Sequence, residues 1–437
     1  MRVSKTLNIL LLGVALWCSG KYLIVEYWDS QADDFSSLYV AARVIDEGKV
    51  TSLYDHHPSL FHVVPPGEFT HTAEQAGFKG FLHPYVHLPL FSFLLRPLLW
   101  IPYSVATKVV LLVNVCAIML SLYLILRLAH REGDMRWWGI GIIALSFFFP
   151  LRYALWLGQT SPLVFLGIVA IYSLVSAGHP RISGALLGGL LCFKLTPLFL
   201  LCYFMLKRQQ VVVIASLATV TVVVIFSILS VGWDAHVAFL HTVTRLKGLS
   251  LASWNNQSLD GFLLRWITDP SQLYNWRLME LGFTMTVVKC GTVLLILLLW
   301  LLIFFFPFPV SGDDRDCLAF SFAIVLMVVL PPIAWSHYLL FLMFPYGVVM
   351  RDLEGWKFMP CCWLVRGGLL VSWVAVALPP SYLGIVDTPS FLLPLAQFPL
   401  THKVPLPVAG SGGFLGVVVL MVVIAFVHLC REHIPSQ

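Results

Sequence analysis

The chain has 437 residues, of which 59% are hydrophobic and only 11% are charged. An ordinary soluble domain has roughly 45–50% apolar and about 25% charged residues, so lipid must be the solvent for most of this chain. The net charge of +5 comes from Lys and Arg scattered among the loops, not from one basic patch. The composition therefore excludes a cytosolic enzyme, a secreted domain and a nucleic-acid-binding protein.

The first twenty residues have the basic start and apolar stretch of a signal peptide. However, Ala-Leu-Trp precedes Cys18, and a Trp there suits neither cleavage nor lipidation. Because many apolar segments follow, we predict that this stretch is retained as the first membrane span.

A membrane-crossing helix needs about 20 mostly apolar residues. We predict an all-α polytopic membrane protein, a single domain over residues 1–437, with about ten full spans. These cover residues 7–25, 105–128, 137–151, 160–177, 211–231, 283–306, 317–334, 338–350, 361–378 and 412–430. Two shorter pieces, 183–193 and 197–206, flank Lys194. They are predicted to form a re-entrant hairpin, because basic residues bracket both ends and Pro197 breaks the middle.

The orientation follows from the basic residues of the short loops. With the N-terminus in the cytoplasm, the short outer loops hold only Arg152 and Lys403. The cytoplasmic stretches then hold Arg2, Lys5, Arg127, Arg131, Arg136, Arg181, Lys207, Arg208, Arg315, Arg351, Lys357 and Arg431. Lys and Arg prefer cytoplasmic loops, so both termini are predicted to be cytoplasmic.

Two long outer loops, residues 26–104 and 232–282, are then predicted to form the catalytic face. The apolar piece 84–101 tests this topology, because a span there would invert everything downstream. It contains Pro84, Pro89, Arg96 and Pro97, so we predict an interfacial or re-entrant juxtamembrane helix on the outer side.

The carboxylates also point to the outer face. The chain has 22 Asp and Glu, none of them in the interior of a predicted span, and nine lie between Glu26 and Glu74. Ion-coupled transporters usually carry ionisable residues inside the membrane. A flippase or transporter therefore becomes the weaker alternative, beside a polysaccharide polymerase or ligase and an ancillary membrane protein without activity.

Asp33 and Asp34 begin a predicted amphipathic helix within the first outer loop. Either they cap its N-terminus, where the helix dipole favours negative charge, or one of them is catalytic. From spacing alone both interpretations stay open. Two adjacent Asp residues are not a metal site by themselves, because hard cations need several oxygen ligands.

Six short motifs occur in an order and spacing typical of one enzyme family. They are Asp34-Phe35 with Tyr39, Ala41-Ala42 and Leu53-Tyr54-Asp55; His83-Pro84 with Leu88-Pro89-Leu90; Leu157-Gly158-Gln159; Gly184 through Lys194-Leu195-Thr196-Pro197; Asn256-Gln257-Ser258-Leu259 with Gly261-Phe262; and Trp335-Ser336-His337. Together they resemble the polyprenol-phosphate-sugar-dependent glycosyltransferases of the GT-C fold, most closely family GT87, which includes the mycobacterial α-1,2-mannosyltransferases. Two departures, His83 in place of Tyr and Thr160-Ser161 in place of Asn, concern sugar specificity.

The resemblance implies an inverting transfer of a sugar from a polyprenyl-phosphate carrier to a hydroxyl of a glycolipid or glycan. Mannose is the first expectation for the sugar and arabinose the second. The reaction is expected on the periplasmic or extracellular face of a bacterial cytoplasmic membrane, with membrane lipid around it. No cofactor, no metal and no nucleic acid is expected to take part.

The resemblance also implies roles for particular residues. Asp34 is expected to be the general base, with Asp33 as the second candidate. Four residues are expected to meet the phosphate: Lys194, Arg152, His337 and Arg265. Lys194 could instead snorkel to the interface, and His337 could be an ordinary hydrogen-bonded histidine. Asn255, Asn256 and Gln257 are expected either to hold sugar hydroxyls or to cap loop turns. Tyr39, His83 and Gln159 complete the expected substrate-binding set.

Overall fold

The computed structural model describes residues 2–54, 59–61, 63–78, 80–305, 312–355, 362–378 and 410–430. Four residues named above, Asp55, Lys357, Lys403 and Arg431, lie outside these ranges.

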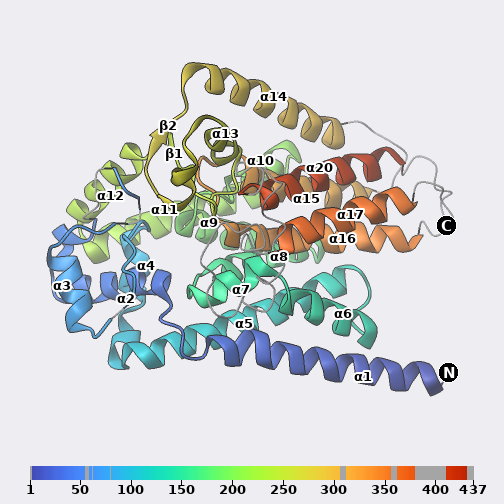
Figure 1. Ribbon diagram of the computed structural model, residues 1–437, viewed down its shortest axis with the longest axis horizontal. Coiled ribbons are helices and arrows are strands. Elements are labelled where there is room, and N and C mark those ends of the chain that lie inside the picture. Colours follow the sequence, from blue (N-terminus) through green and yellow to red (C-terminus); the bar gives the residue numbers. More distant parts are fainter. Residues whose placement is uncertain are drawn as a thin grey trace.

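The first part of the chain forms one long helix and a group of short ones. These elements are α1 (Arg2–Ser19), the π-helical turn η1 (Gly20–Ile24), η2 (Val25–Tyr27), α2 (Asp33–Asp46), η3 (Val50–Ser52), α3 (Glu68–Gln75), α4 (Pro89–Leu94) and η4 (Arg96–Trp100). The piece 84–101 thus holds two short helices, which agrees with the prediction that no spanning helix runs there. Figure 1 shows α2, α3 and α4 gathered at one end of the molecule.

The helix bundle follows, with a small irregular region beside it. Its elements are α5 (Tyr103–Leu128), α6 (Met135–Ser146), α7 (Phe149–Trp156), α8 (Ser161–Ser176), α9 (Pro180–Phe193), α10 (Leu198–Leu206), α11 (Gln210–Val231), α12 (Trp233–Arg245), β1 (Leu249–Ser250), α13 (Leu259–Ile267), η5 (Pro270–Tyr274), β2 (Met279–Glu280), α14 (Phe283–Phe305), α15 (Gly312–Val329), η6 (Ser336–Leu342), α16 (Met343–Gly355), α17 (Cys362–Ala377) and α20 (Gly412–Cys430). Strands β1 and β2 pair antiparallel, with Leu249 opposite Glu280.

This is the architecture of an all-α membrane protein. Within the described residues, five helices are long and apolar enough to cross a membrane, beginning at Lys5, Tyr103, Gln210, Phe283 and Gly412. The bent pair α6 and α7 would make a sixth span. Helices α8, α9, α15 and α17 are apolar but shorter, so the prediction of ten full spans stays a prediction.

The prediction of one continuous helix for the third span was wrong. Residues 137–151 were expected to form a single helix, but α6 ends at Ser146 and α7 begins at Phe149 with a bend of 60°. Pro150 lies in the first turn of α7. It lacks an N–H, and its ring would clash with the carbonyl four residues earlier, at Ser146, so a straight helix is broken or kinked here. After the bend, Arg152 lies beside η2, where its guanidinium donates to Glu26 and Tyr27.

The long helix α5 connects the two ends of the molecule. At its start the Tyr103 hydroxyl donates hydrogen bonds to the carbonyls of Gln31 and Ala32, at 2.7 and 3.0 Å. Its 26 residues span about 39 Å at 1.5 Å per residue. The beginning of α1 and the end of α20 both lie toward the end of the molecule opposite α2, apart from each other (Figure 1).

Two hydrophobic cores hold the structure. The larger one fills the bundle, and its centre is α15, which is buried from Cys317 to Val329. The smaller one lies beneath α2, where the Phe35 ring stacks on Tyr103 with 5.9 Å between centroids. On the outside of the bundle, Leu229 and Phe283 are 80% and 86% exposed, as expected of side chains that meet lipid. The smaller core fixes α2, and with it the two Asp residues.

Candidate active site

The helix α2 begins in an unusual way. Ala32 before it has left-handed backbone angles, φ 50° and ψ 56°, and no side chain caps the helix. Instead, the Asp34 and Phe35 amides donate to the carbonyl of Leu157, at 3.0 and 3.3 Å. The interpretation of the Asp pair as capping side chains was therefore wrong. Asp33 and Asp34 are the first two residues of the helix, where the dipole still favours their charge, and their carboxylates are available for other contacts.

The carboxylate of Asp34 is held between two side chains from distant loops. Gln159 Nε2 donates to Oδ2 at 2.5 Å, and His83 Nε2 lies 3.3 Å from Oδ1. The Gln159 backbone is itself fixed, because Asn114 Nδ2 in α5 donates to its carbonyl at 2.8 Å. Three of the predicted site residues, Asp34, His83 and Gln159, thus meet in one cluster.

A glycine makes this close approach feasible. Gly158 has φ +66°, and a Cβ on it would lie 2.6 Å from Cβ of Ala32 and 2.9 Å from Cβ of Phe35. A side chain at this position would push the 157–159 turn away from α2. The Leu-Gly-Gln motif therefore works as a tight turn that delivers the Gln159 amide to Asp34.

Asp33 has different surroundings from its neighbour. Burial raises the pKa of its carboxyl, with Asp34 adding to the effect and His83 opposing it. Its Oδ1 has no hydrogen-bond partner in the described structure. That oxygen lies so close to Gly80 that a Cβ there would collide with it. Two residues that sequence spacing could not separate are therefore distinct: Asp34 is held by polar side chains, and Asp33 is packed against the 80–81 backbone.

Lys194 faces the same cluster from the break between α9 and α10. Its Nζ lies 4.5 Å from the centroid of the Tyr338 ring. Burial lowers the pKa of Lys194 to about 7, while the Asp34 charge acts in the opposite direction. A cation within the field of Asp34 is placed to meet an anion there, and the side chain packs against Tyr338 instead of extending to the interface.

His337 comes next to this lysine at the start of η6. It is 2% exposed, and neither ring nitrogen has a hydrogen-bond partner among the described residues. Its ring centroid lies 4.8 Å from that of Tyr338 and 6.2 Å from that of Tyr153. Burial and the charges of Lys194 and His83 hold the pKa of His337 well below its usual range. The alternative of an ordinary hydrogen-bonded histidine was wrong, because no described residue forms a hydrogen bond with either ring nitrogen.

The sequence reasoning missed three members of this cluster: His87, Tyr153 and Tyr338. The His87 ring stacks on Phe193 with 5.1 Å between centroids, one residue before Lys194, and burial lowers its pKa to about 4. His87 lies four residues after the predicted site residue His83, with Pro84 between them, and this spacing was a signal for His87. Tyr338 directly follows the Trp-Ser-His motif, so extending that motif by one residue would have found it.

Two predicted residues have partners elsewhere. Arg152 is buried, and its guanidinium donates to Glu26 Oε1 at 2.7 Å and to the Tyr27 hydroxyl at 3.0 Å. It was expected to meet the substrate phosphate, but Glu26 already neutralises it. Tyr39 is 2% exposed, and its hydroxyl donates to the Ile101 carbonyl at 3.1 Å. Both side chains fix the position of elements around the site.

The Asn-Gln-Ser motif holds the backbone of three segments together. Asn256 Nδ2 donates to the carbonyls of Leu251 and Pro332, at 2.9 and 3.2 Å, and its Oδ1 accepts from the Ala334 amide at 2.9 Å. Gln257 ties the same loop to the start of α20, because its Oε1 accepts from the Phe414 amide at 2.8 Å. Of the two open interpretations, this geometry favours loop capping.

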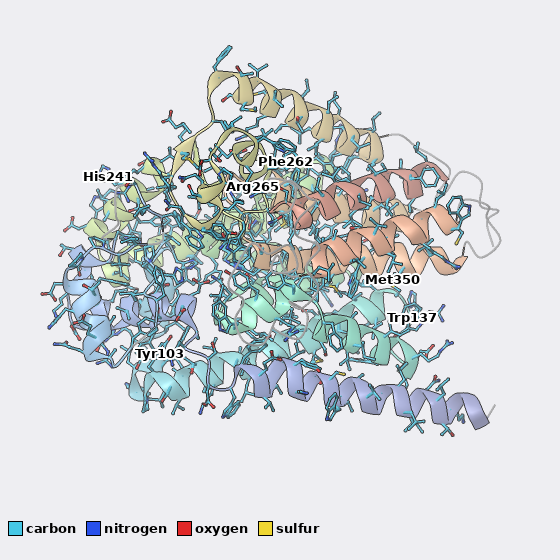
Figure 2. The ribbon with its side chains drawn as sticks, in the orientation of Figure 1. Tyr103, Trp137, His241, Phe262, Arg265 and Met350 are labelled. Atoms are coloured by element: carbon cyan, nitrogen blue, oxygen red, sulfur yellow. The ribbon has the colours of Figure 1, made fainter. Side chains whose placement is uncertain are left out.

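Asn255 and Arg265 belong to the same scaffold. Asn255 Oδ1 accepts from Trp276 Nε1 at 3.1 Å. Arg265 is 3% exposed and donates to Ser411 Oγ at 2.8 Å and to the carbonyls of Ser253 and Asn256, at 3.0 and 2.8 Å. Figure 2 shows Arg265 in the region of the short strands and α13. These groups hold the loop that presents Trp335 and His337.

Comparison with known proteins gives this cluster a context. The family model for glycosyltransferase family 87 matches residues 85–332, more than half of the chain. The match includes Gln159 and Lys194 and stops short of Asp34, His83 and His337. No solved structure matches.

Two curated relatives share the same printed description, polyprenol-phosphate-mannose-dependent alpha-(1-2)-phosphatidylinositol mannoside mannosyltransferase. The protein from Mycolicibacterium smegmatis is 24% identical over an alignment of 324 residues, and the match covers 68% of this chain and 69% of the relative. The protein from Mycobacterium tuberculosis is 22% identical over an alignment of 317 residues, and the match covers 68% of this chain and 70% of the relative. The resemblance drawn from the motifs is confirmed: the chain belongs to glycosyltransferase family 87.

Proposed function

We propose that this glycosyltransferase transfers a sugar from a polyprenyl phosphate to a hydroxyl of a glycolipid, with inversion at the anomeric carbon. The donor is inferred from the two relatives, whose printed names specify polyprenol-phosphate-mannose and a phosphatidylinositol mannoside. Mannose is accordingly the proposed sugar, and arabinose is the second candidate. The single observation that carries the proposal is the Asp34 carboxylate, held by Gln159 and His83 within the field of Lys194.

In the proposed reaction the acceptor oxygen forms a bond to the anomeric carbon as the bond from that carbon to the phosphate oxygen breaks. Asp34 takes the proton of the attacking hydroxyl. One hydrogen bond from Gln159 and one contact with His83 leave lone pairs on the carboxylate for this step. The phosphate leaves with an additional negative charge, and Lys194 stabilises it. His337 offers a neutral ring nitrogen to a phosphate or sugar hydroxyl from the same side.

We further propose that this chemistry takes place on the outer face of a bacterial cytoplasmic membrane. Three observations support this location. The Asp34 cluster lies at the end of the bundle opposite the beginning of α1 and the end of α20 (Figure 1). The short loops at the latter end carry most of the basic residues, as expected of cytoplasmic loops. The piece 84–101 forms short helices. In this proposal residues 1–437 form one GT-C domain of about ten spans with a re-entrant hairpin at Lys194.

The test is the variant Asp34→Asn, which keeps the shape of the side chain and removes its basic charge. Loss of a general base lowers a rate by about 10²–10⁴-fold, and we expect such a fall in kcat with the polyprenyl-phosphate-mannose donor. Donor binding should remain, because Lys194 and His337 are unchanged. The matched control is Asp33→Asn, a neighbouring carboxyl in the same turn, which should lower kcat much less.

The activities of the two variants together identify the general base. A near wild-type rate for Asp34→Asn together with an inactive Asp33→Asn would move the base by one residue. If both variants remain active, the base lies elsewhere, and His337 becomes the first residue to test. Size-exclusion elution of each purified variant separates a loss of folding from a loss of chemistry.

A further inference from the structure

A large cavity lies at the end of the bundle that the Asp34 cluster does not occupy. It has a volume of about 1150 Å³ and opens between the ends of α5, α8, α10 and α16 and the start of α15. Ligand sites typically measure about 300–1,000 Å³. Figure 2 shows Met350, one residue before the lining residue Arg351, toward the opposite end of the molecule from Tyr103, on which α2 rests. The length of α5 separates this cavity from the sugar-transfer site.

The walls and the rim of this cavity differ in chemistry. Its walls include Leu124, Leu174 and Phe204, with further aliphatic side chains from α5 and α8. Its polar part holds three cationic side chains, Arg127, Lys207 and Arg351, two acidic ones, Glu132 and Asp316, and also His130 and His179. The cations of the rim outnumber its acids by one, and an apolar wall with such a rim suits an amphiphile with an anionic head.

The cations of the rim are not all neutralised by the protein. Lys207 pairs with Asp316, and Arg351 pairs with Asp352 at 3.0 Å. By contrast, no described residue forms a hydrogen bond or ion pair with the side chain of Arg127. An unpaired guanidinium at the mouth of a cavity is well suited to a phosphate, which it can bind through two parallel hydrogen bonds.

Two simpler explanations account for the charges but not for the cavity. Basic residues at the C-terminal ends of helices stabilise the helix dipole, and basic residues are enriched in cytoplasmic loops. Neither explanation requires four helix ends to separate around an apolar space. Basic pockets between transmembrane helices are known to hold phosphate head groups of anionic lipids.

We propose that this cavity binds the phosphate head group of an anionic phospholipid from the membrane leaflet opposite Asp34, with an acyl chain along the wall of Leu124, Leu174 and Phe204. Arg127 is the principal phosphate ligand, and His130 and His179 lie beside it on the rim. This binding site is distinct from the sugar-transfer site and does not depend on the proposed reaction. The lipid fills the space between the helix ends and stabilises them there.

The experiment uses the purified full-length chain in neutral detergent and three probes: dioleoyl phosphatidylglycerol, dioleoyl phosphatidylcholine and glycerol 3-phosphate. Native mass spectrometry measures lipid binding, and thermal unfolding measures the accompanying rise in Tm. We expect phosphatidylglycerol to bind in preference to phosphatidylcholine. The variant Arg127→Gln should weaken phosphatidylglycerol binding by about tenfold or more, as expected for the loss of a charge-assisted hydrogen bond.

The matched control is Arg181→Gln, which removes an exposed basic residue from the same end of the molecule, outside the cavity lining. It should bind phosphatidylglycerol as the wild type does. A second variant, Ala170→Phe, fills the cavity wall without changing a charge and should also weaken binding. It keeps the test decisive if Arg127→Gln does not fold.

Three results would overturn the proposal. The first is equal binding of phosphatidylcholine and phosphatidylglycerol. The second is an equal effect of Arg127→Gln and Arg181→Gln, which would indicate only general surface attraction. The third is displacement of the lipid by glycerol 3-phosphate at a similar concentration, which would assign the cavity to a soluble phosphate ester. Sugar transfer is not a readout here, so failure of this proposal and failure of the proposed function are distinguishable.

Discussion

Two polar regions lie at the same end of this molecule, and both carry motifs of the same family. In the Asn-Gln-Ser loop, the side chains of Asn256 and Gln257 are bonded to backbone groups of the protein itself. In the Asp34 cluster, Lys194 lies over an aromatic ring and His337 has two unpartnered nitrogens. A buried polar group without a partner costs free energy, so proteins keep such groups mainly where a ligand completes them. The contrast separates motif residues that stabilise the fold, Asn256 and Gln257, from motif residues whose polar groups remain for a substrate, Lys194 and His337.

After Asp34→Asn, the largest effect is expected for the cation of the cluster. Lys194→Met keeps the length of the side chain and removes its charge. We expect kcat/KM for the polyprenyl-phosphate donor to fall by about 10²–10³-fold, the loss typical when one group that stabilises developing negative charge is removed. Steady-state kinetics over a range of donor concentrations measures this. An unchanged kcat/KM would mean that another side chain meets the phosphate.

The pH profile provides the control for this variant. Burial places the pKa of Lys194 at about 7, and only the protonated form below that pKa attracts the phosphate. The wild-type kcat/KM, which reports groups of the free enzyme, should therefore fall as the pH rises above about 7. Lys194→Arg should remove this fall, because a guanidinium stays protonated throughout. If the fall persists in Lys194→Arg, it belongs to another group.

The next prediction tests the scaffold. Asn256→Ala removes the side-chain partner of the Leu251 carbonyl and of the Ala334 amide, at a position that is fully buried, while the Pro332 carbonyl keeps the hydroxyls of Ser250 and Ser258. Each buried group left unsatisfied costs about 1–3 kcal/mol, so the free energy of unfolding should fall by about 2–5 kcal/mol. The donor KM of the protein that remains folded should not change.

The control for the scaffold is Asn275→Ala, in the same 249–280 segment, whose side chain forms no hydrogen bond with a described residue. Chemical denaturation of both variants gives the comparison. If Asn256→Ala unfolds like the wild type but binds the donor weakly, the Asn-Gln-Ser loop is a substrate site and the contrast between the two regions fails.

A smaller effect is expected at Gln159, which was predicted to bind substrate and which donates to Asp34. Gln159→Leu removes that donor at nearly the same volume. A hydrogen bond to a charged group contributes about 1.5–3 kcal/mol, and we expect kcat to fall by about tenfold with the donor KM unchanged. The split between kcat and KM decides the role, because a raised KM with normal kcat would restore the prediction of substrate binding.

Hydropathy predicted the most apolar helices nearly to the residue. The predicted spans 105–128, 211–231 and 283–306 compare with observed helices at 103–128, 210–231 and 283–305. Lipid requires a continuous apolar stretch with every backbone group paired, and that requirement is visible in sequence. The break between α6 and α7 escaped prediction, because apolar residues continue through it and only Pro150 marks it.

The sequence predicted the site residues that belong to a motif. It did not predict roles that depend on contacts between residues far apart in the chain. The motifs brought forward Asp34, Gln159, Lys194 and His337, which the structure gathers at one end. Arg152 was misjudged because its partner Glu26 lies 126 residues away in sequence. The polarity of a loop sequence does not reveal whether a cation such as Arg152 is already paired with an acidic residue elsewhere in the chain. For the same reason, spacing could not separate Asp33 from Asp34, whose surroundings come from residues 80–83 and 157–159.

The smallest effect is predicted for removal of metal ions. Two features of the Asp34 cluster disfavour a divalent ion: the carboxylate already contacts Gln159 and His83, and the charge of Lys194 lies within its field. No group of three His, Cys, Asp or Glu at ligand spacing occurs among the residues that the structure describes, and hard cations need several oxygen ligands. We therefore expect sugar transfer to proceed unchanged in EDTA, because Lys194 neutralises the departing phosphate. Loss of activity in EDTA that Mg²⁺ or Mn²⁺ restores would show instead that a metal ion performs the role assigned to this lysine.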